Sequence, residues 1–241
     1  MKLLKKTIKN FLHYLGFEVY RYDPSAAEFG RFSNALRMFE IDLVLDVGAN
    51  EGQFGEGLRA SGYKGDIVYF EPLKLAHLNL LKISKRDPRW HVHPRAAEGQ
   101  SPGEISINVS ANSVSSSVLS MLNSHKHAAP QAIFIGKEAC EVITLDSVRS
   151  IYLDGAKAVL LKIDTQGYEW QVMNGAIEKI SMVRGMLIEM SLVYLYKGQR
   201  LWQDIIERLG ASGFTLWALQ PAFLDPKNGR TLQLDGLFFR L

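Results

Sequence analysis

The stretch LVLDVGANEGQF at residues 43–54 constrains the fold of this chain more than any other. An apolar run from Leu43 leads into Asp46, a turn with Gly48 and Gly52 follows, and a helical pattern begins near Gln53. Glycines let the backbone approach a ligand closely and adopt angles that other residues avoid. Amides at a helix N-terminus then face the crevice beyond the strand. Such a strand–turn–helix predicts the front of a nucleotide-type cofactor site in an α/β fold.

The spacing in this turn separates the candidate cofactors. A dinucleotide fingerprint reads G-x-G-x-x-G, but Asn50 follows Gly48 where the second glycine should stand. A phosphate-binding P-loop would need G-K-[ST], which is absent here. The pattern D-x-G-x-N-x-G therefore favours a ligand without phosphates, such as S-adenosylmethionine (SAM). A plain strand–helix turn that binds nothing is the alternative interpretation.

Length and composition predict a single globular unit. The chain has 241 residues, of which 47% are hydrophobic, enough for one α/β domain with a sizeable core. Its one cysteine, Cys140, cannot form an internal disulfide and fits a reducing compartment, so we expect a cytoplasmic protein. No apolar run reaches the roughly 18 residues of a membrane span, and no signal peptide is visible.

Charge is concentrated at the N-terminus. The net charge is +3, and residues 1–22 contribute five basic side chains against Glu18, which leaves a nearly neutral body. A neutral body argues against a nucleic-acid partner. Residues 2–15 predict an amphipathic helix whose apolar face carries Leu4, Ile8, Phe11, Leu12 and Leu15, with lysines opposite. Residues 1–22 could lie on an anionic membrane surface, or the helix could pack on the domain with its lysines in solvent.

The rest of the chain alternates between strand and helix patterns. We predict residues 1–40 as a helical lead-in and residues 41–241 as one domain with an inserted segment at about 103–145. The expected strands are 42–47, 66–70, 90–95, 158–164 and 185–190, and the expected helices lie within 23–40 and over 73–85, 168–180 and 201–209. Segments 214–219 and 232–240 predict a terminal hairpin with an antiparallel edge strand. Within the insert, strands 104–109 and 140–145 flank a polar segment, which we interpret as a lid or substrate loop, with a disordered insert as the alternative.

Several polar residues fall where the strands end. In an open doubly wound sheet, ligands bind outside the carboxyl ends of the strands. The residues predicted there are Asp46, Asn50, Glu71, Asp164 and Glu189. Glu71 follows Gly52 at a distance where an acidic side chain can accept both ribose hydroxyls. Alternatively, Glu71 complements the dipole of the next helix.

Taken together, these motifs resemble one known family. Asp46–Phe54, Glu71-Pro72, the turn 96–99, Thr144–Asp146 and the run LKIDTQGYE at 161–169 occur in the order seen in FkbM methyltransferases. The resemblance covers roughly residues 41–190. It implies a class I methyltransferase fold, which is a Rossmann-like doubly wound sheet, with SAM as cofactor and methyl transfer to a hydroxyl oxygen. Family acceptors are often sugars of glycans or secondary metabolites. The family commonly has Glu where this chain has Gln166, so one charge is missing here.

The resemblance also implies roles for individual residues. Asp164 would lie near the sulfonium and the acceptor, and Glu71 would hold the ribose. The cofactor residues carried over are Asp46, Gly48, Asn50, Gly52, Phe54, Glu71, Pro72, Ala96 and Ala97. The positions implied by the resemblance agree with the strand ends predicted above. Carboxylates near a sulfonium cation are electrostatically favourable.

A hydroxyl acceptor needs a general base, for which Asp164 is the first candidate and Glu189 the second. His125 or His127 could serve if the polar segment folds over the site. Lys162 shares a strand face with Asp164 and could orient it, or could form a structural ion pair. His91 and His93 make a weak case for a metal, and a metal held by Asp164 and Glu189 stays open.

These residues predict a SAM-dependent O-methyltransferase acting on a small-molecule or glycan acceptor. Two alternatives belong to other classes: an NAD(P)-dependent Rossmann oxidoreductase, and a non-catalytic membrane-associated binding subunit. Methylation of nucleic acid is a third, disfavoured by the charge distribution. The sequence sets neither the acceptor nor the oligomeric state.

Overall fold

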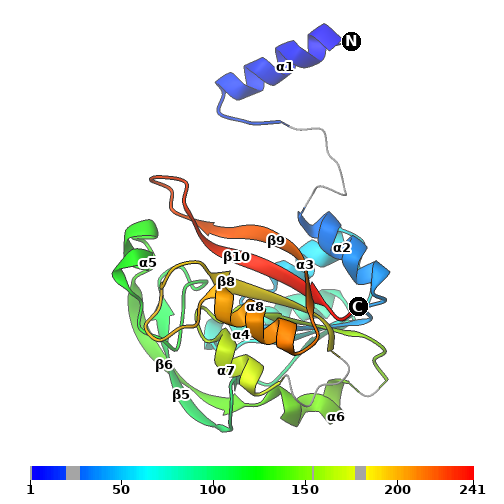
Figure 1. Cartoon of the computed structure of the whole chain (residues 1–241), viewed down its shortest axis with the longest axis vertical. Helices are drawn as coiled ribbons and strands as arrows, with labels where there is room; N and C mark the ends of the chain where they lie inside the picture. Colours follow the sequence, from blue (N-terminus) through cyan, green and yellow to red (C-terminus); the bar gives the residue numbers. More distant parts are fainter. Residues whose placement is uncertain (1, 20–27, 154, 177–182) are drawn as a thin grey trace.

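The computed structural model describes residues 2–19, 28–153, 155–176 and 183–241, and it places a seven-stranded sheet between two layers of helices (Figure 1). The strand order is β3-β2-β1-β7-β8-β10-β9. The strands are β1 Leu43–Val47, β2 Asp66–Phe70, β3 Trp90–Val92, β7 Val159–Ile163, β8 Val183–Ser191, β9 Thr215–Leu224 and β10 Thr231–Phe239. This arrangement confirms the predicted class I methyltransferase fold.

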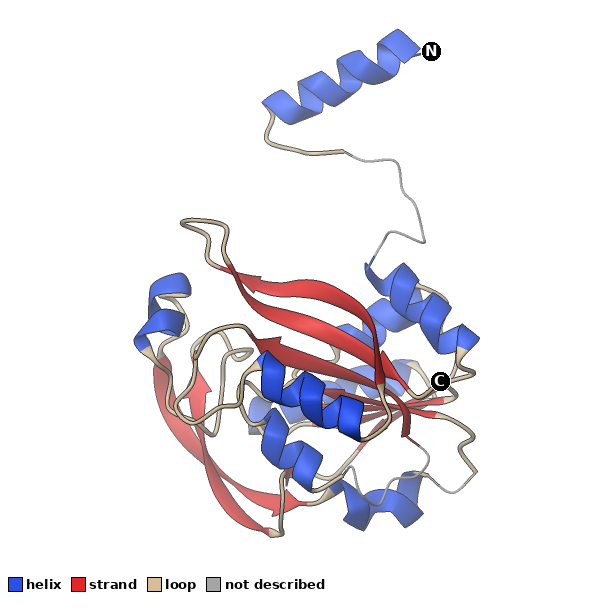
Figure 2. Ribbon diagram, viewed as in Figure 1, coloured by secondary structure: helices blue, strands red, loops and turns tan. Residues whose placement is uncertain are grey.

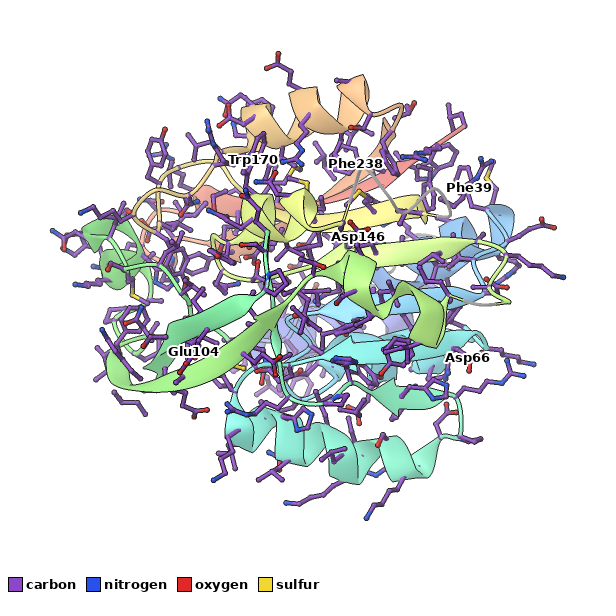
Figure 3. All side chains as sticks on the ribbon, turned by 90° about the horizontal axis from the view of Figure 1, so that it is seen from below. Phe39, Asp66, Glu104, Asp146, Trp170 and Phe238 are labelled. Atoms are coloured by element: carbon purple, nitrogen blue, oxygen red, sulfur yellow. The ribbon has the colours of Figure 1, made fainter. Side chains whose placement is uncertain are left out.

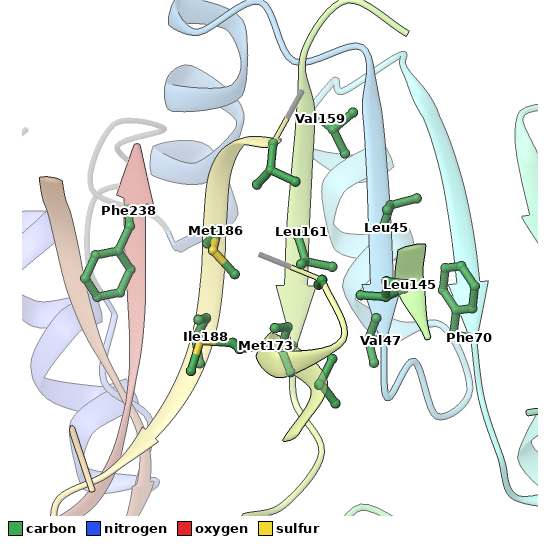
Figure 4. Packing of buried hydrophobic residues seen from close by; sticks show 14 of the residues in the cluster. Leu45, Val47, Phe70, Leu145, Val159, Leu161, Met173, Met186, Ile188 and Phe238 are labelled. Carbon is green, nitrogen blue, oxygen red and sulfur yellow. The ribbon is translucent and has the colours of Figure 1, made fainter. Parts of the chain in front are cut away.

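The central strands are buried on both faces, which explains their continuous apolar sequence. All five residues of β1 are buried, and β1 pairs in parallel with β2 and with β7, placing Val47 opposite Phe70 and Ile163. Figure 4 shows Leu45, Val47 and Phe70 on one side of this packing and Met186 and Ile188 on the other. Their burial fixes the sheet and thereby the positions of the turns at its carboxyl edge.

Helices cover both faces of the sheet. One face packs against α2 Glu28–Met38, α3 Gln53–Ala60 and α4 Lys74–Ile83, which is followed by the short 3-10 helix η1 Ser84–Arg86. The other face packs against η2 Leu145–Val148, α6 Arg149–Tyr152, α7 Glu169–Asn174 and α8 Trp202–Ala211. Trp170 projects from α7 beside α8, where the guanidinium of Arg208 lies 4.4 Å from its ring centroid (Figure 3).

Antiparallel pairing occurs at the predicted edge of the sheet. The strand β10 pairs antiparallel with β8 and with the edge strand β9, so the last two strands form a hairpin. The strand that runs against the others is therefore β10, which is second from the edge of the sheet. Without a helix between β9 and β10, the chain has no crossover and must reverse direction.

The insert forms a second, smaller sheet of order β4-β6-β5 beside the main one (Figure 2). Its strands are β4 Ala97–Glu98, β5 Gly103–Ser110 and β6 Phe134–Ile143, and β5 pairs antiparallel with β6 as predicted, over a longer stretch. The helix α5 Asn123–Ala128 lies between them. The polar segment is therefore ordered, and the disordered alternative is wrong.

Two predicted elements differ in extent. The strand predicted at 90–95 ends at Val92, and the helix predicted at 168–180 ends at Asn174. Gly175 caps the end of that helix, where its amide bonds back to the carbonyls of Gln171 and Val172. This position requires glycine, because a Cβ there would lie 2.1 Å from the Gly99 carbonyl oxygen. Residues 177–182 lie outside the described part of the chain.

The N-terminal helix α1 Lys2–Tyr14 forms over the range predicted from its periodicity and stands apart from the sheet and its helices (Figure 1). No helix in the described ranges is long and apolar enough to cross a membrane.

Candidate functional site

A cavity of about 340 Å³ opens at the carboxyl ends of β1, β2 and β7. The main sheet supplies one wall through the turns that follow these strands, and the insert supplies the other. The lining residues are Gly48, Ala49, Asn50, Gln53, Phe54, Glu71, Pro72, Leu73, Ala97, Glu98, Ile107, Ser113, Val114, Ser116, Ser117, Val118, Lys162, Asp164, Thr165, Gln166 and Tyr168. Its position is the one that ligands occupy in doubly wound sheets.

The turn after β1 depends on glycine at Gly48. This residue has φ +76°, and a Cβ atom there would lie 1.9 Å from the backbone oxygen of Asp164. The β1 and β7 turns therefore pack backbone against backbone. Asn50, with φ +48°, adopts the left-handed conformation that asparagine tolerates better than most residues.

Glu71 ties the end of β2 to the glycine turn. Its Oε2 accepts the Asn50 amide at 2.7 Å, and its Oε1 accepts the Leu73 amide at 2.8 Å. Burial raises the pKa of Glu71 to about 7 even though these two donors oppose the shift. Each carboxylate oxygen retains a second lone pair, so the side chain can accept two further hydroxyl groups from a ligand in the cavity.

A buried ion pair lies beneath the cavity floor. The ammonium of Lys162 lies 2.9 Å from Asp46 Oδ1 and 3.6 Å from Asp164 Oδ2. Asp46 is 0% exposed, and burial raises its pKa while the lysine opposes the shift. Burial alone would lower the pKa of Lys162, but Asp46 and Asp164 raise it, so the lysine stays charged. The geometry supports both roles considered for Lys162, which neutralises Asp46 and holds Asp164.

Gln166 joins the two candidate bases. Its amide nitrogen donates to Asp164 Oδ1 at 2.9 Å and to Glu189 Oε2 at 2.7 Å. Gln233, buried on β10, also donates to Glu189 Oε2 at 2.7 Å. Burial and the neighbouring Asp164 charge raise the pKa of Glu189 well above its usual range. Gln166 thus holds the two carboxyl groups together at the edge of the cavity.

The insert is hydrogen-bonded to both turns of the main sheet. Ser113 Oγ lies 3.3 Å from the Asn50 side-chain nitrogen, and Ser117 Oγ donates to the Gln166 carbonyl at 2.6 Å. Tyr196 donates its hydroxyl to Gln166 Oε1 at 3.0 Å and lies 3.2 Å from His125 Nε2. The insert therefore helps to set the orientation of the Gln166 amide.

Two buried acids at the site were not singled out from the sequence. Glu98 on β4 lines the cavity, and its Oε1 has no hydrogen-bond partner among the described residues. Burial, and then the Glu71 charge, raise the pKa of Glu98 well above its usual range. Glu169 accepts the amides of Thr165 and Gly167 at 3.0 and 2.9 Å, and burial raises its pKa to about 7. The position of Glu98 in the turn 96–99, close to the end of the strand predicted at 90–95, was the signal available.

The structure gathers most of the predicted site residues but not all of them. Those on the cavity wall are Gly48, Asn50, Phe54, Glu71, Pro72, Ala97, Lys162 and Asp164. The others are Asp46 and Glu189, which contact wall residues from behind, and Gly52 and Ala96, which are buried outside the lining.

The four histidines considered from the sequence lie off the cavity wall. His125 is buried against Tyr196, and His127 is exposed on α5. His91 pairs with Asp66 at 3.1 Å, and His93 Nδ1 lies 2.9 Å from the Tyr152 hydroxyl. Among the described residues no group of three or more His, Cys, Asp or Glu side chains has metal-ligand geometry.

With this geometry in hand, the chain can be compared with known families. The profile of the methyltransferase FkbM domain matches residues 46–216, which include the glycine turn, Glu71, the insert and the Asp164 turn. The chain belongs to the FkbM methyltransferase domain family. The FkbM domain thus spans both walls of the cavity, and membership implies SAM as its cofactor.

Comparison with other proteins adds fold likeness only. No curated protein matches the sequence. The methyltransferase FkbM of Methylobacillus flagellatus KT is 14% identical over 82% of this chain and 44% of that chain, with a TM-score of 0.47, so this chain spans less than half of that protein. TehB of Haemophilus influenzae is 8% identical over 88% and 62%, with a TM-score of 0.47. Aeropyrum pernix fibrillarin, solved with SAM bound, is 9% identical over 82% and 66%, with a TM-score of 0.45.

The residues around the cavity of the FkbM domain fit SAM. Glu71 retains acceptor capacity for the ribose hydroxyls, and the orphaned Glu98 Oε1 is a buried acceptor for a polar edge of the adenine. The sulfonium is a cation, and Asp164 supplies a carboxylate on the same wall. The described side chains can therefore bind the ribose, the adenine and the sulfonium of SAM.

Proposed function

We propose that this FkbM domain transfers the methyl group of SAM to a hydroxyl oxygen of an uncharged, polyhydroxylated acceptor such as a sugar. The observation that carries the proposal is the carboxylate of Asp164 on the cavity wall, held by the Gln166 amide at 2.9 Å and by Lys162 at 3.6 Å. An alcohol is a weak nucleophile, so a fixed base near its proton speeds the transfer. SAM, when bound, supplies the electrophilic methyl carbon.

The charges of the cavity support an acceptor without phosphate or carboxylate groups. Of the lining residues, only Lys162 is basic, and its ammonium is already paired with Asp46 and lies near Asp164. The remaining charged lining residues are the acids Glu71, Glu98 and Asp164. An anionic acceptor would meet this acidic wall without a free cation to bind it, and desolvating it there would be costly.

The insert offers groups suited to a sugar. Its contribution to the wall alternates hydroxyls with small apolar side chains, namely Ser113, Val114, Ser116, Ser117 and Val118. Hydroxyls both donate and accept, so they match the mixed donors and acceptors of a polyol. The aromatic ring of Tyr168, which also lines the cavity, provides an apolar face for a sugar ring.

In this proposal the other residues around Asp164 position it. Asp164 would accept the proton of the acceptor hydroxyl as its oxygen bonds to the methyl carbon and the bond from that carbon to the sulfur of SAM breaks. Lys162 and the Gln166 amide hold the carboxylate at the cavity wall. Burial and the neighbouring Asp164 charge raise the pKa of Glu189, which disfavours a second negative charge beside the base. Because Gln166 already bridges the two carboxylates, we expect methyl transfer that EDTA does not reduce.

The test is a methyl-transfer assay with radiolabelled SAM and a panel of neutral sugars, each paired with its phosphorylated form. We expect transfer to a neutral member only, and we expect Asp164→Asn to lower kcat by about 10²–10⁴-fold with little change in S-adenosylhomocysteine (SAH) affinity. Methylation of the phosphorylated partner at equal rate would contradict the proposed acceptor class. An unchanged kcat in Asp164→Asn would remove the assigned base.

Gln166→Glu tests the positioning role separately. A third carboxylate between Asp164 and Glu189 adds like charge beside the proposed base and should move the rise of the pH–rate profile to higher pH. A merely structural role would lower the amount of folded enzyme without moving the profile. Gln166→Met, which lacks both the charge and the donor, is the matched control for side-chain volume.

A further inference from the structure

The N-terminal helix α1 presents an apolar surface that nothing in the described structure covers. Ile8, Phe11 and Leu15 are 50%, 61% and 51% exposed. Their spacing of three and four residues places them on one side of the helix, together with Leu12. Monomeric proteins rarely leave such a contiguous apolar strip in water, so this one calls for a partner.

The opposite side of the helix identifies the partner. Lys6, Lys9 and His13 lie across from the apolar strip, and the segment Lys2–Tyr14 contains no acidic residue. Residues 1–22 carry more than the whole excess of positive charge, because the rest of the chain is slightly negative. The body of the protein, or of a second copy, therefore offers little net negative charge to attract these lysines.

We propose that α1 lies in the headgroup region of an anionic lipid bilayer and anchors the domain to it. An amphipathic helix with lysines on its polar face and large apolar residues opposite binds such an interface in the membrane plane. The apolar strip enters the acyl boundary while the lysines stay with the phosphates. This is surface binding, consistent with the finding that no described helix could span a membrane. The proposal does not depend on the acceptor or on Asp164.

The experiment is co-sedimentation of the full chain with vesicles. We compare phosphatidylcholine vesicles that contain phosphatidylglycerol with pure phosphatidylcholine vesicles, at low and high salt. Binding should require phosphatidylglycerol and weaken with salt, because the charges of α1 and the headgroups are screened. Failure of the wild-type chain to sediment with the anionic vesicles would overturn the proposal.

Matched variants separate the helix from general charge and hydrophobicity. Lys6→Gln/Lys9→Gln should lower the partition coefficient about 30-fold, from about fivefold per lysine. Lys64→Gln/Lys85→Gln removes the same charge from exposed positions on the body and should have little effect. Phe11→Ser should also release the protein, while Leu75→Ser, at an exposed leucine on α4, should not.

The remaining outcomes also decide the matter. If Phe11→Ser lowers the unfolding stability but not vesicle binding, α1 packs on its own domain and the proposal is wrong. If wild type forms a dimer that Phe11→Ser dissociates, without vesicle binding in either, a second copy covers the strip and the proposal is again wrong. SAH titration of every variant shows whether its cofactor site is folded. A loss of cofactor binding is thereby distinguished from a loss of vesicle binding.

Discussion

Removing the ammonium of Lys162 should show how strongly the buried ion pair supports the fold. Lys162→Met keeps most of the side-chain volume but leaves Asp46, which is 0% exposed, without its counter-charge at 2.9 Å. No other donor among the described residues reaches either oxygen of Asp46. Breaking a buried pair from one side costs about 3–5 kcal/mol, so we expect a loss of that size in the free energy of unfolding.

The double variant Asp46→Asn/Lys162→Met provides the decisive comparison. It removes both charges and leaves a neutral buried amide, whose unmet hydrogen bonds cost about 1–3 kcal/mol. The double variant should therefore be more stable than Lys162→Met alone, although it carries one more substitution. Urea unfolding followed by circular dichroism measures this, with an unchanged slope as the check on two-state behaviour.

The pH dependence gives an independent check on the same reasoning. In Lys162→Met the folded state raises the pKa of Asp46 above its unfolded value, so folding takes up a proton and stability falls as pH rises through the folded pKa. The stability gap between the single and double variants should therefore close at low pH. The ion-pair argument would be refuted if the double variant lost as much unfolding free energy as Asp46→Asn and Lys162→Met lose together. It would also be refuted if the difference in stability between Lys162→Met and the double variant did not depend on pH.

Three further predictions concern the same turns. Glu71→Ala should weaken SAH binding at least about tenfold, the effect of one lost charged hydrogen bond, in calorimetric titrations of variants whose melting shows them folded; undiminished affinity would place the ribose elsewhere. Gly48→Ala should lower the free energy of unfolding by more than about 3 kcal/mol, because its Cβ would overlap the Asp164 carbonyl. The control Gly62→Ala, at φ +95° with nothing within 4 Å of its Cβ, should cost only about 1–2 kcal/mol of backbone strain. Equal losses would mean that the overlap at Gly48 relaxes. Glu169, with a pKa of about 7, binds more protons in the folded than in the unfolded protein. The free energy of unfolding of wild type should therefore fall by about 3 kcal/mol relative to that of Glu169→Gln as pH rises from about 4.5 to about 7. Parallel curves of unfolding free energy against pH would contradict the raised pKa of Glu169.

The fold was largely predictable because local patterns and burial agree along the central strands. The apolar run before Gly48 predicted a strand, and that strand is buried along its whole length. The pairing of Asp46 with Lys162 was not predicted, because it depends on β1 and β7 lying side by side in the sheet. The closing hairpin followed from the lack of a helix between its strands. The lengths of elements were less predictable. Periodicity continues the helix past Asn174, but Gly175 caps it and packs against the distant Gly99 backbone, where a Cβ would not fit.

The insert marks the limit of prediction at the site. Its serines indicated a polar loop, but sequence periodicity does not predict that a three-stranded sheet carries those serines to the cavity. Three contacts between residues distant in sequence tie it to the site: Asn50 with Ser113, Gln166 with Ser117, and Gln166 with His125 through Tyr196, which lies outside the insert. None could be inferred from spacing, because each joins separate turns that only the assembled sheet brings together.

Gln166 shows most clearly why the chemistry had to await the structure. As a sequence position it was a departure from a family pattern, a missing charge without a role. In the fold it has φ +53°, and this left-handed turn aims its amide at Asp164 and Glu189 together. A neutral donor between two acids adds no third negative charge beside them, while burial raises the pKa of Glu189. The missing charge therefore fits the proposed reaction, in which the Gln166 amide holds the Asp164 carboxylate as the base.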